Sequence, residues 1–278
     1  STLFPYTTLF RSGRREFMRQ FLKELAVGIS FYTRVPIQLK SVSEDEFYHC
    51  MLYMPIIGVF IGALMFAAGW LLGHWQRTAL SAVALLIFYI WITGGLHYDG
   101  VADTVDALFS ARDRDRMMAI MKDSRLGAFG AIGLVLLLFT MWGSYQILIK
   151  ALPISLLLMP VIGRYCAVQT CAFSTYAEGG GGLGKRITEI AKPCHVLVYL
   201  ILIGGLTWWL RPILLLAFGM TVVLNLLLMA YCNRKFAGIT GDQIGLTIEM
   251  TQAIFMVAAI AMMDAAPVLT QITGGLLA

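Results

Sequence analysis

Three aspartates follow one another at helical spacing in the segment "GGLHYDGVADTVDAL", residues 94–108. Asp99, Asp103 and Asp106 are four and then three residues apart, so an α-helix would place their carboxylates on one face, a turn apart. The residues between them are mostly small or apolar, and none is a lysine or arginine. Because three like charges stacked in this way repel one another, we expect a cation to neutralise them. A solvated helix face is the alternative.

Magnesium is the cation that best suits this segment. Mg²⁺ prefers oxygen ligands, keeps several waters and is often held by a few carboxylates together with substrate phosphates. The sequence therefore predicts a Mg²⁺ site formed by Asp99, Asp103 and Asp106, with Asp123 of "MKDSRLGAFG" as a further ligand. His97 precedes these acids and is a candidate for a hydrogen bond to a phosphate or to a ligating carboxylate. A purely structural histidine is the alternative.

Other polar residues are candidates for binding the substrate, with the basic ones contacting phosphates. Arg164 interrupts the apolar run "PVIGRYCAVQT", where an ionisable side chain indicates a function. The glycine-rich "EGGGGLGKRI" could wrap phosphates with its backbone N–H groups, or it could serve only as a linker. The predicted substrate-binding residues are Lys122, Arg125, Arg164, Lys185, Arg186 and Asp242.

The elements that would position these residues are mainly transmembrane helices. Of the 278 residues, 59% are hydrophobic and 13% are charged, about half the charged fraction of roughly 25% in soluble domains. Seven apolar stretches are long enough to cross a bilayer. We therefore predict an all-α, polytopic membrane protein with spans at 51–73, 78–96, 128–149, 153–173, 195–210, 212–232 and 250–270.

Charged residues are distributed unevenly between the predicted loops. If the N-terminus is cytoplasmic, the cytoplasmic segments 1–50, 97–127, 174–194 and 233–249 contain 17 of the 21 lysines and arginines, in agreement with the positive-inside rule. They also contain 15 of the 16 acidic residues. We therefore predict a prokaryotic cytoplasmic (inner) membrane protein whose N-terminus and acidic site face the cytoplasm. The basic residues form no long run of the kind that binds nucleic acid.

The N-terminal region has two parts. Residues 1–13 read like an in-frame translation of a sequencing adapter, and we predict that they are not native. The segment 17–37 has apolar residues at helical spacing, which predicts a helix lying on or dipping into the cytoplasmic interface. A plain solvated helix is the alternative.

Five segments, including the acidic one, resemble the cobalamin synthase family, the adenosylcobinamide-GDP ribazoletransferases. They are similar to five family elements and follow in family order from about residue 21 to 250. Tyr98 is a departure, because a small aliphatic residue is usual there. In chain order the segments are "FYTRVPI", "GGLHYDGVADTVDAL", "MKDSRLGAFG", "EGGGGLGKRI" and "TGDQIGLTIE".

The resemblance implies a Mg²⁺-dependent transferase, formed as one membrane-embedded domain by residues 14–278. Such an enzyme joins adenosylcobinamide-GDP to α-ribazole or its 5′-phosphate and releases GMP, after a ribazole hydroxyl attacks the phosphorus on the cobinamide side. Phosphoryl transfer needs mainly positioning and neutralisation of charge. His97 or one of the aspartates, Asp99 and Asp103 among them, would accept the hydroxyl proton. The resemblance does not decide whether the chain forms a homo-oligomer or binds partners in B12 assembly.

Two other functions are alternatives. A CDP-alcohol phosphotransferase would keep the reaction type, but its usual motif has an arginine after the alanine, where this chain has Asp103 after Ala102. An ion-coupled transporter would use Asp99, Asp103 and Arg164 as an ion pathway. Against a transporter, the acids lie at the predicted membrane edge, and the sequence has no evident inverted repeat.

Overall fold

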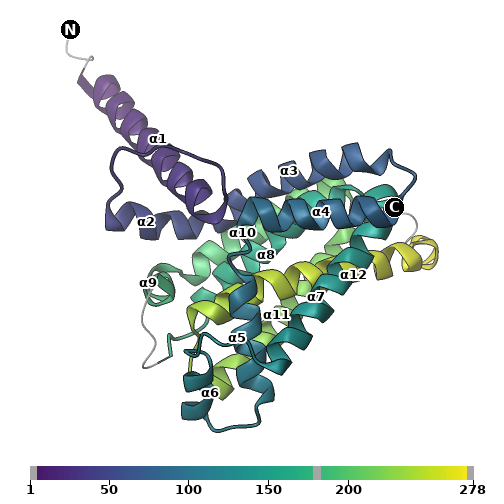
Figure 1. Ribbon diagram of the computed structural model, residues 1–278. Coiled ribbons are helices and arrows are strands. Elements are labelled where there is room, and N and C mark those ends of the chain that lie inside the picture. Colours follow the sequence, from purple (N-terminus) through teal and green to yellow (C-terminus); the bar gives the residue numbers. More distant parts are fainter. Residues whose placement is uncertain (1–4, 178–182, 274–278) are drawn as a thin grey trace.

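A computed structural model describes residues 5–177 and 183–273 (Figure 1). The predicted all-α class is confirmed, because the described residues contain no strand and only one isolated bridge, between Tyr176 and Ile239. In chain order the helices are α1 (Pro5–Tyr32), α2 (Glu44–Cys50), the 3-10 turn η1 (Met51–Tyr53), α3 (Met54–Gly73), α4 (Thr78–Thr93), α5 (Tyr98–Phe109), α6 (Arg114–Ile120), α7 (Ala128–Ala151), α8 (Ile154–Ala172), α9 (Leu183–Ile190), α10 (Pro193–Leu210), α11 (Leu214–Phe236) and α12 (Gly241–Thr273).

The chain is a multi-pass membrane protein. Six helical segments in its described part are long and apolar enough to cross a membrane, and α4 with α5 makes a seventh if this bent pair is one span. Large apolar side chains such as Trp91, Phe139, Ile201 and Leu227 are exposed on the outside of these helices, as a lipid-facing surface requires. The six are α3 with the short helices before it, α7, α8, α10, α11 and α12.

The last span begins earlier than predicted. The sequence placed 233–249 outside the spans as a cytoplasmic segment, but α11 continues to Phe236 and α12 begins at Gly241. Polar residues lower the hydropathy of the first turns of α12, although Gln243 and Glu249 are both buried inside the bundle. The predicted start of the last span at residue 250 is therefore wrong, and Glu249 lies within its helix.

Two glycines end α4. Gly94 and Gly95 have φ angles of 68° and 66°, in the left-handed region that glycine adopts without strain. The chain turns by 96° between α4 and α5, so α5 leaves the direction of the span. A third glycine, Gly100, brings α5 against α12, because a Cβ there would lie 2.5 Å from the carbonyl oxygen of Asp242. Gly94 and Gly95 thus end α4, and Gly100 permits the close approach of α5 to α12.

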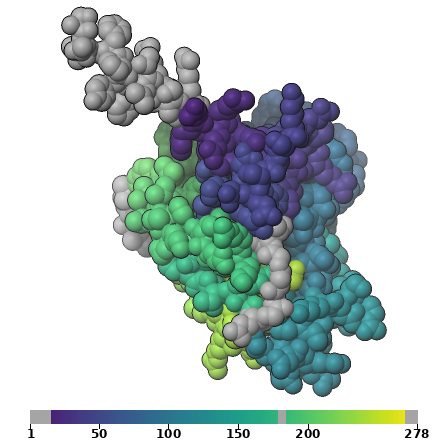
Figure 2. Space-filling model, turned by 90° about the vertical axis from the view of Figure 1, so that its left-hand side faces the viewer, coloured from purple at the N-terminus to yellow at the C-terminus, as the bar shows by residue number. Residues whose placement is uncertain are grey.

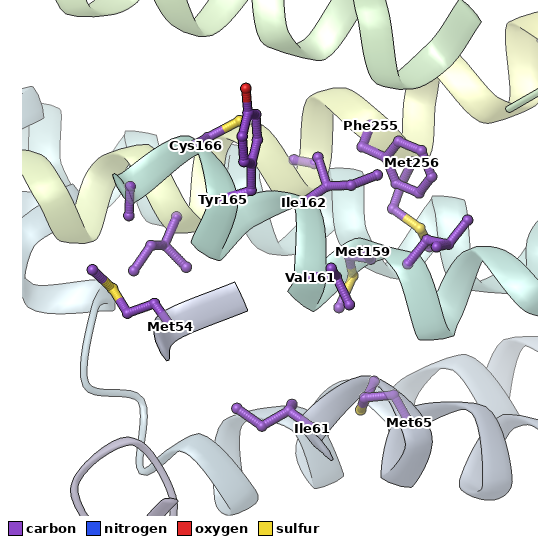
Figure 3. Packing of buried hydrophobic residues seen from close by; sticks show 14 of the residues in the cluster. Met54, Ile61, Met65, Met159, Val161, Ile162, Tyr165, Cys166, Phe255 and Met256 are labelled. Atoms are coloured by element: carbon purple, nitrogen blue, oxygen red, sulfur yellow. The ribbon is translucent and has the colours of Figure 1, made fainter. Parts of the chain in front are cut away.

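Helix α8 forms the centre of the bundle. Nearly all of its side chains are buried, and it packs mainly against α3 and α12. Figure 3 shows Ile162 on α8, Phe255 on α12 and Ile61 on α3 among the buried side chains. In lipid, packing of this kind is what holds helices together.

Two small residues allow the closest of these contacts. Gly58 and Gly62 lie one turn apart on α3, and a Cβ at Gly58 would lie 2.6 Å from the carbonyl oxygen of Pro160 in α8. A Cβ at Gly62 would collide with the carbonyl oxygen of Leu157. The segment "GVFIG" is thus a small-xxx-small motif, the usual means of bringing two membrane helices into backbone contact.

Helix α1 projects from the bundle (Figure 1). It ends at Tyr32, and the backbone N–H of Arg34 then donates to the carbonyl oxygen of Ile92, 2.8 Å away. An ion pair of 2.7 Å between Lys23 and Glu46 joins α1 to α2. The predicted N-terminal helix is confirmed, while its position in the membrane interface and the non-native origin of residues 1–13 stay predictions.

Candidate active site

The acidic segment lies at the end of the bundle where α5, α7 and α12 begin. Segments distant in sequence meet on this side: Figure 2 shows α2 in blue, the green segment around α9 and the teal segment of α5 and α6 on one face. Two cavities open here. One lies toward α12 and α9, and the other toward α6 and α7.

The first cavity, here called the histidine cavity, has a volume of about 280 Å³. His97 and Asp99 line it from the start of α5, and Asp242 lines it from the first turn of α12. The rest of its wall is mainly apolar or glycine: Phe31, Tyr32, Met51, Met54, Leu96, Gly100, Gly184, Ile187, Gly241, Ile244, Gly245 and Ile248.

The second cavity, here called the arginine cavity, has a volume of about 530 Å³. Asp103 and Asp106 line it from α5. It differs from the histidine cavity because several arginines face the same space as the carboxylates. Its other lining residues are Ser110, Arg112, Arg116, Ile120, Asp123, Arg125, Leu126, Gly127 and Phe129.

Asp103 experiences a concentration of negative charge. It is half-buried on α5, and burial is the largest cause that raises the pKa of its carboxyl, to about 6. The carboxylates of Asp99, Asp242 and Asp106 raise the pKa of Asp103 further, in that order. Every charged group that shifts it is therefore an acid. Such a site favours a bound cation.

Asp106 has a backbone partner. Its carboxylate is buried and accepts a hydrogen bond of 2.7 Å from the N–H of Gly127, directly before α7. A Cβ at Gly127 or Gly130 would collide with this carboxylate, which explains both glycines of "MKDSRLGAFG". A negative charge at a helix N-terminus is also favourable. Asp106 thus fixes α7 to α5.

Asp123 is neutralised within its own segment. Its carboxylate accepts three hydrogen bonds from the Arg125 guanidinium, of 2.5 Å from Nη2 and of 2.9 Å and 3.1 Å from Nε. Hydrogen bonds from Arg125 lower the pKa of Asp123 to about 2. Both residues line the arginine cavity, and Lys122 beside them is exposed.

The structure does not bring the four predicted magnesium ligands to one point. In the described part of the chain, no three Asp, Glu, His or Cys side chains stand close enough to share one ion. Asp99, Asp103 and Asp242 instead share a region of negative charge where α5 meets α12. Their carboxylate oxygens suit Mg²⁺, which needs only one or two carboxylates when water and phosphate supply the other ligands. The metal assignment stays a prediction.

The predicted basic residues occupy different places. Lys185 and Arg186 are exposed on α9, whose Gly184 and Ile187 line the histidine cavity. Arg186 forms an ion pair of 3.1 Å with Glu189. Residues 178–182 of the predicted phosphate-wrapping segment lie outside the described residues.

Arg164 does not join the cavities. Its side chain has no exposed surface, and it lies among the buried residues of α8. Nη1 donates to the carbonyl oxygen of Pro160 at 3.3 Å, while Nε and Nη2 have no hydrogen-bond partner in the described part of the chain. Its predicted contact with a phosphate stays a prediction that this position does not favour.

Sequence reasoning missed two buried residues next to His97, namely Tyr89 and Glu249. Glu249 of α12 accepts hydrogen bonds from the Tyr89 hydroxyl at 3.0 Å and has an Oε1 3.3 Å from His97 Nδ1. The acid of "TGDQIGLTIE" was visible as a motif residue, but its segment was placed outside the predicted spans. The contact joins residues 152 positions apart, a separation that no local pattern reports.

Comparisons with known proteins agree on one family. The cobalamin-5-phosphate synthase family model matches residues 24–260. An adenosylcobinamide-GDP ribazoletransferase of Clostridium botulinum (strain 657 / Type Ba4) is 33% identical over 248 residues, covering 88% of this chain and 100% of the relative. The relative of the same name from Alkaliphilus oremlandii is 34% identical over 241 residues, covering 86% and 97% of the two chains. No solved structure matches.

Proposed function

The chain belongs to the cobalamin-5-phosphate synthase family, and on that premise we propose that it acts as an adenosylcobinamide-GDP ribazoletransferase. The observation that carries this function is the agreement of the family match with the relatives of that name, which align over nearly their whole length. The five motifs that first indicated the family lie within or directly beside the matched region. Adenosylcobinamide-GDP is the donor substrate, and α-ribazole or its 5′-phosphate is the proposed acceptor.

The reaction exchanges one phosphorus–oxygen bond for another. The acceptor hydroxyl forms a bond to the phosphorus on the cobinamide side, the bond from that phosphorus to GMP breaks, and GMP leaves. The hydroxyl proton passes to a basic atom of the site and then to water. The chain therefore has to align the hydroxyl with the phosphorus and offset the charge of the diphosphate.

Magnesium is proposed to bind at Asp99 and Asp103, with Asp242 as a neighbouring acid. Two observations support this choice: the pKa of Asp103 is raised, and the charged groups that shift it are all carboxylates. When bound, Mg²⁺ supplies charge neutralisation at the diphosphate. Asp106 would act differently, by holding α7 against α5 through Gly127.

Basic side chains around the two cavities are proposed to bind the phosphates. Arg112 and Arg116 line the arginine cavity beside Asp103, and Arg125 and Lys122 lie near them. Lys185 and Arg186 stand next to the histidine cavity on α9. We also propose that this end of the bundle faces the cytoplasm of a prokaryotic cell, because the basic residues outside the spans gather there.

Turnover by the purified protein tests the function. The protein in detergent or nanodiscs is incubated with adenosylcobinamide-GDP, α-ribazole and Mg²⁺, and GMP and the cobalamin product are measured. Equimolar release of GMP and formation of the cobalamin are expected, and chelation of Mg²⁺ should stop both. An Asp103→Asn sample serves as the control for contaminating activity. Absence of product with well-folded protein would refute the function.

A further inference from the structure

A buried carboxylate lies beside a residue of the histidine cavity. Glu249 is only 1% exposed, and its carboxylate contacts His97 and Tyr89 at 3.3 Å and 3.0 Å. Removing a carboxylate from water is costly unless hydrogen bonds compensate for the loss. An apolar residue would pack in α12 without that cost, so the acid needs an explanation.

The hydrogen bonds around Glu249 form a chain that ends at the cavity. Nε2 of Gln252 donates to the carbonyl oxygen of Ile248 at 3.1 Å and to the Tyr89 hydroxyl at 2.8 Å. The Tyr89 hydroxyl has a single hydrogen and two possible acceptors, Gln252 Oε1 at 2.9 Å and the Glu249 carboxylate at 3.0 Å. Because a charged acceptor forms the stronger hydrogen bond, we assign this hydrogen to Glu249, while the hydroxyl oxygen accepts from Gln252 Nε2. Glu249 then has lone pairs left for His97, the member of this chain that lines the cavity.

Other titratable groups surround Glu249 on the neighbouring helices. Tyr98 of α5 and Tyr145 of α7 lie near enough to interact with its charge. The charge of Arg164 on α8 acts on Tyr89 as well. Among the described residues, His97 is the only basic side chain within ion-pair distance of Glu249. The contact with His97 is therefore specific.

His97 has little freedom to turn away. The residue is 8% exposed, and its ring centroid lies 6.0 Å from that of Tyr32. A Cβ at Gly245 would lie 3.3 Å from the backbone carbonyl oxygen of His97. A neutral imidazole that donates from Nδ1 carries its lone pair on Nε2, on the opposite edge of the ring. The partner of Nδ1 thus decides whether Nε2 donates or accepts a hydrogen bond.

We propose that Glu249 is a positioning residue, whose carboxylate accepts a hydrogen bond from His97 Nδ1–H and so keeps Nε2 as an acceptor for the attacking ribazole hydroxyl. This proposal rests on the transferase function above and assigns the acceptor hydroxyl to the histidine cavity. There Asp99 and Asp242 face the same space, which places the hydroxyl next to the carboxylates proposed for the donor's diphosphate. Loss of Glu249 would leave substrate binding intact but disturb the orientation of the hydroxyl.

Kinetics of Glu249→Gln test this role. The amide has the same shape but no charge and can present either a donor or an acceptor to Nδ1, so we expect kcat to fall about 100-fold, as a misplaced reacting group does. KM for adenosylcobinamide-GDP should stay within about twofold. Asn225→Leu is the matched control: it removes three buried hydrogen bonds between α11 and α8 at a residue that lines neither cavity. If both variants lost activity in proportion to their loss of thermal stability, Glu249 would be merely structural.

The tautomer of His97 gives a readout that does not depend on activity. ¹⁵N-labelled histidine is introduced, and His97→Gln identifies the His97 signals among the four histidines. At a pH where the ring is neutral, we expect the hydrogen of wild-type His97 on Nδ1, and a mixture of tautomers in Glu249→Gln. A wild-type ring with its hydrogen on Nε2 would overturn the proposal even if the variant failed to fold. Should the wild type release no GMP from the donor, the transferase function would fail, while the tautomer would still decide the Glu249–His97 contact.

Discussion

A single methyl group at Gly100 should separate the two helices that carry the acidic site. In Gly100→Ala, the new Cβ would lie 2.5 Å from the carbonyl oxygen of Asp242 and 2.8 Å from its Cα. Ordinary contact begins near 3.4 Å, so α5 and α12 must move apart by about 0.9 Å, because both atoms belong to the backbone and cannot rotate away. Overpacking of this kind costs about 1–3 kcal/mol. A displacement of about 1 Å between groups that act together lowers a rate about 100-fold.

The effect of the contact can be separated from the helix propensity of alanine. Gly143 lies in α7, and apart from the backbone of α7 itself no atom of the described residues lies within 4 Å of the position that a methyl group would take there, so Gly143→Ala should be neutral or stabilising by up to about 1 kcal/mol. Both variants are compared with the wild type by GMP release and by thermal unfolding in the same detergent. We expect a large loss of kcat only in Gly100→Ala. Equal activity of the two variants would refute the view that α5 and α12 must touch for catalysis.

Three further results are expected. Asp103→Asn should abolish GMP release while leaving the unfolding temperature unchanged or higher, since it removes a half-buried charge surrounded by other acids; normal turnover would remove Asp103 from the site. Arg164→Met should leave KM for the donor within about twofold and keep or raise thermal stability, because two nitrogens of the fully buried guanidinium, Nε and Nη2, lack partners among the described residues; a large rise in KM would restore its role as a phosphate contact. Arg125→Ala should raise the pKa of Asp123 from about 2 toward its ordinary value of about 3.9, as seen by carboxyl NMR. With the depressed pKa of the wild type, the stabilisation from the Asp123–Arg125 pair is present above about pH 3.9 and is lost as the pH falls through about 2. An Asp123 pKa of about 2 in the variant would show that Arg125 does not cause the depression.

Local patterns were sufficient for most of the spans and for the helix that carries the acids. Apolar runs predicted the spans, and the spacing of Asp99, Asp103 and Asp106 predicted one helix for all three. Spacing alone did not reveal that these carboxylates divide between two cavities, because the walls of those cavities come from distant segments. Asp106 in particular finds its partner at Gly127.

Hydropathy failed where polar residues are bonded inside the bundle. The first turns of α12 contain Asp242, Gln243 and Glu249, which make the segment look like a loop to any measure of average polarity. In the structure Gln243 accepts from the N–H of Thr240, and Glu249 accepts from Tyr89. A polar side chain with a partner in the interior differs from a solvated one only through tertiary structure, so a single sequence does not separate them.

The central position of α8 has a consequence for how the protein enters its membrane. It is the least apolar of the six candidate spans, and an arginine at the middle of a helix adds roughly 2.5–3.5 kcal/mol to the free energy of insertion. Its main neighbour α3 is synthesised earlier and α12 later. When α8 leaves the ribosome, therefore, α3 has been synthesised but α12 has not. Helix α8 must then pack against α3 at Gly58 and Gly62 before lipid surrounds Arg164.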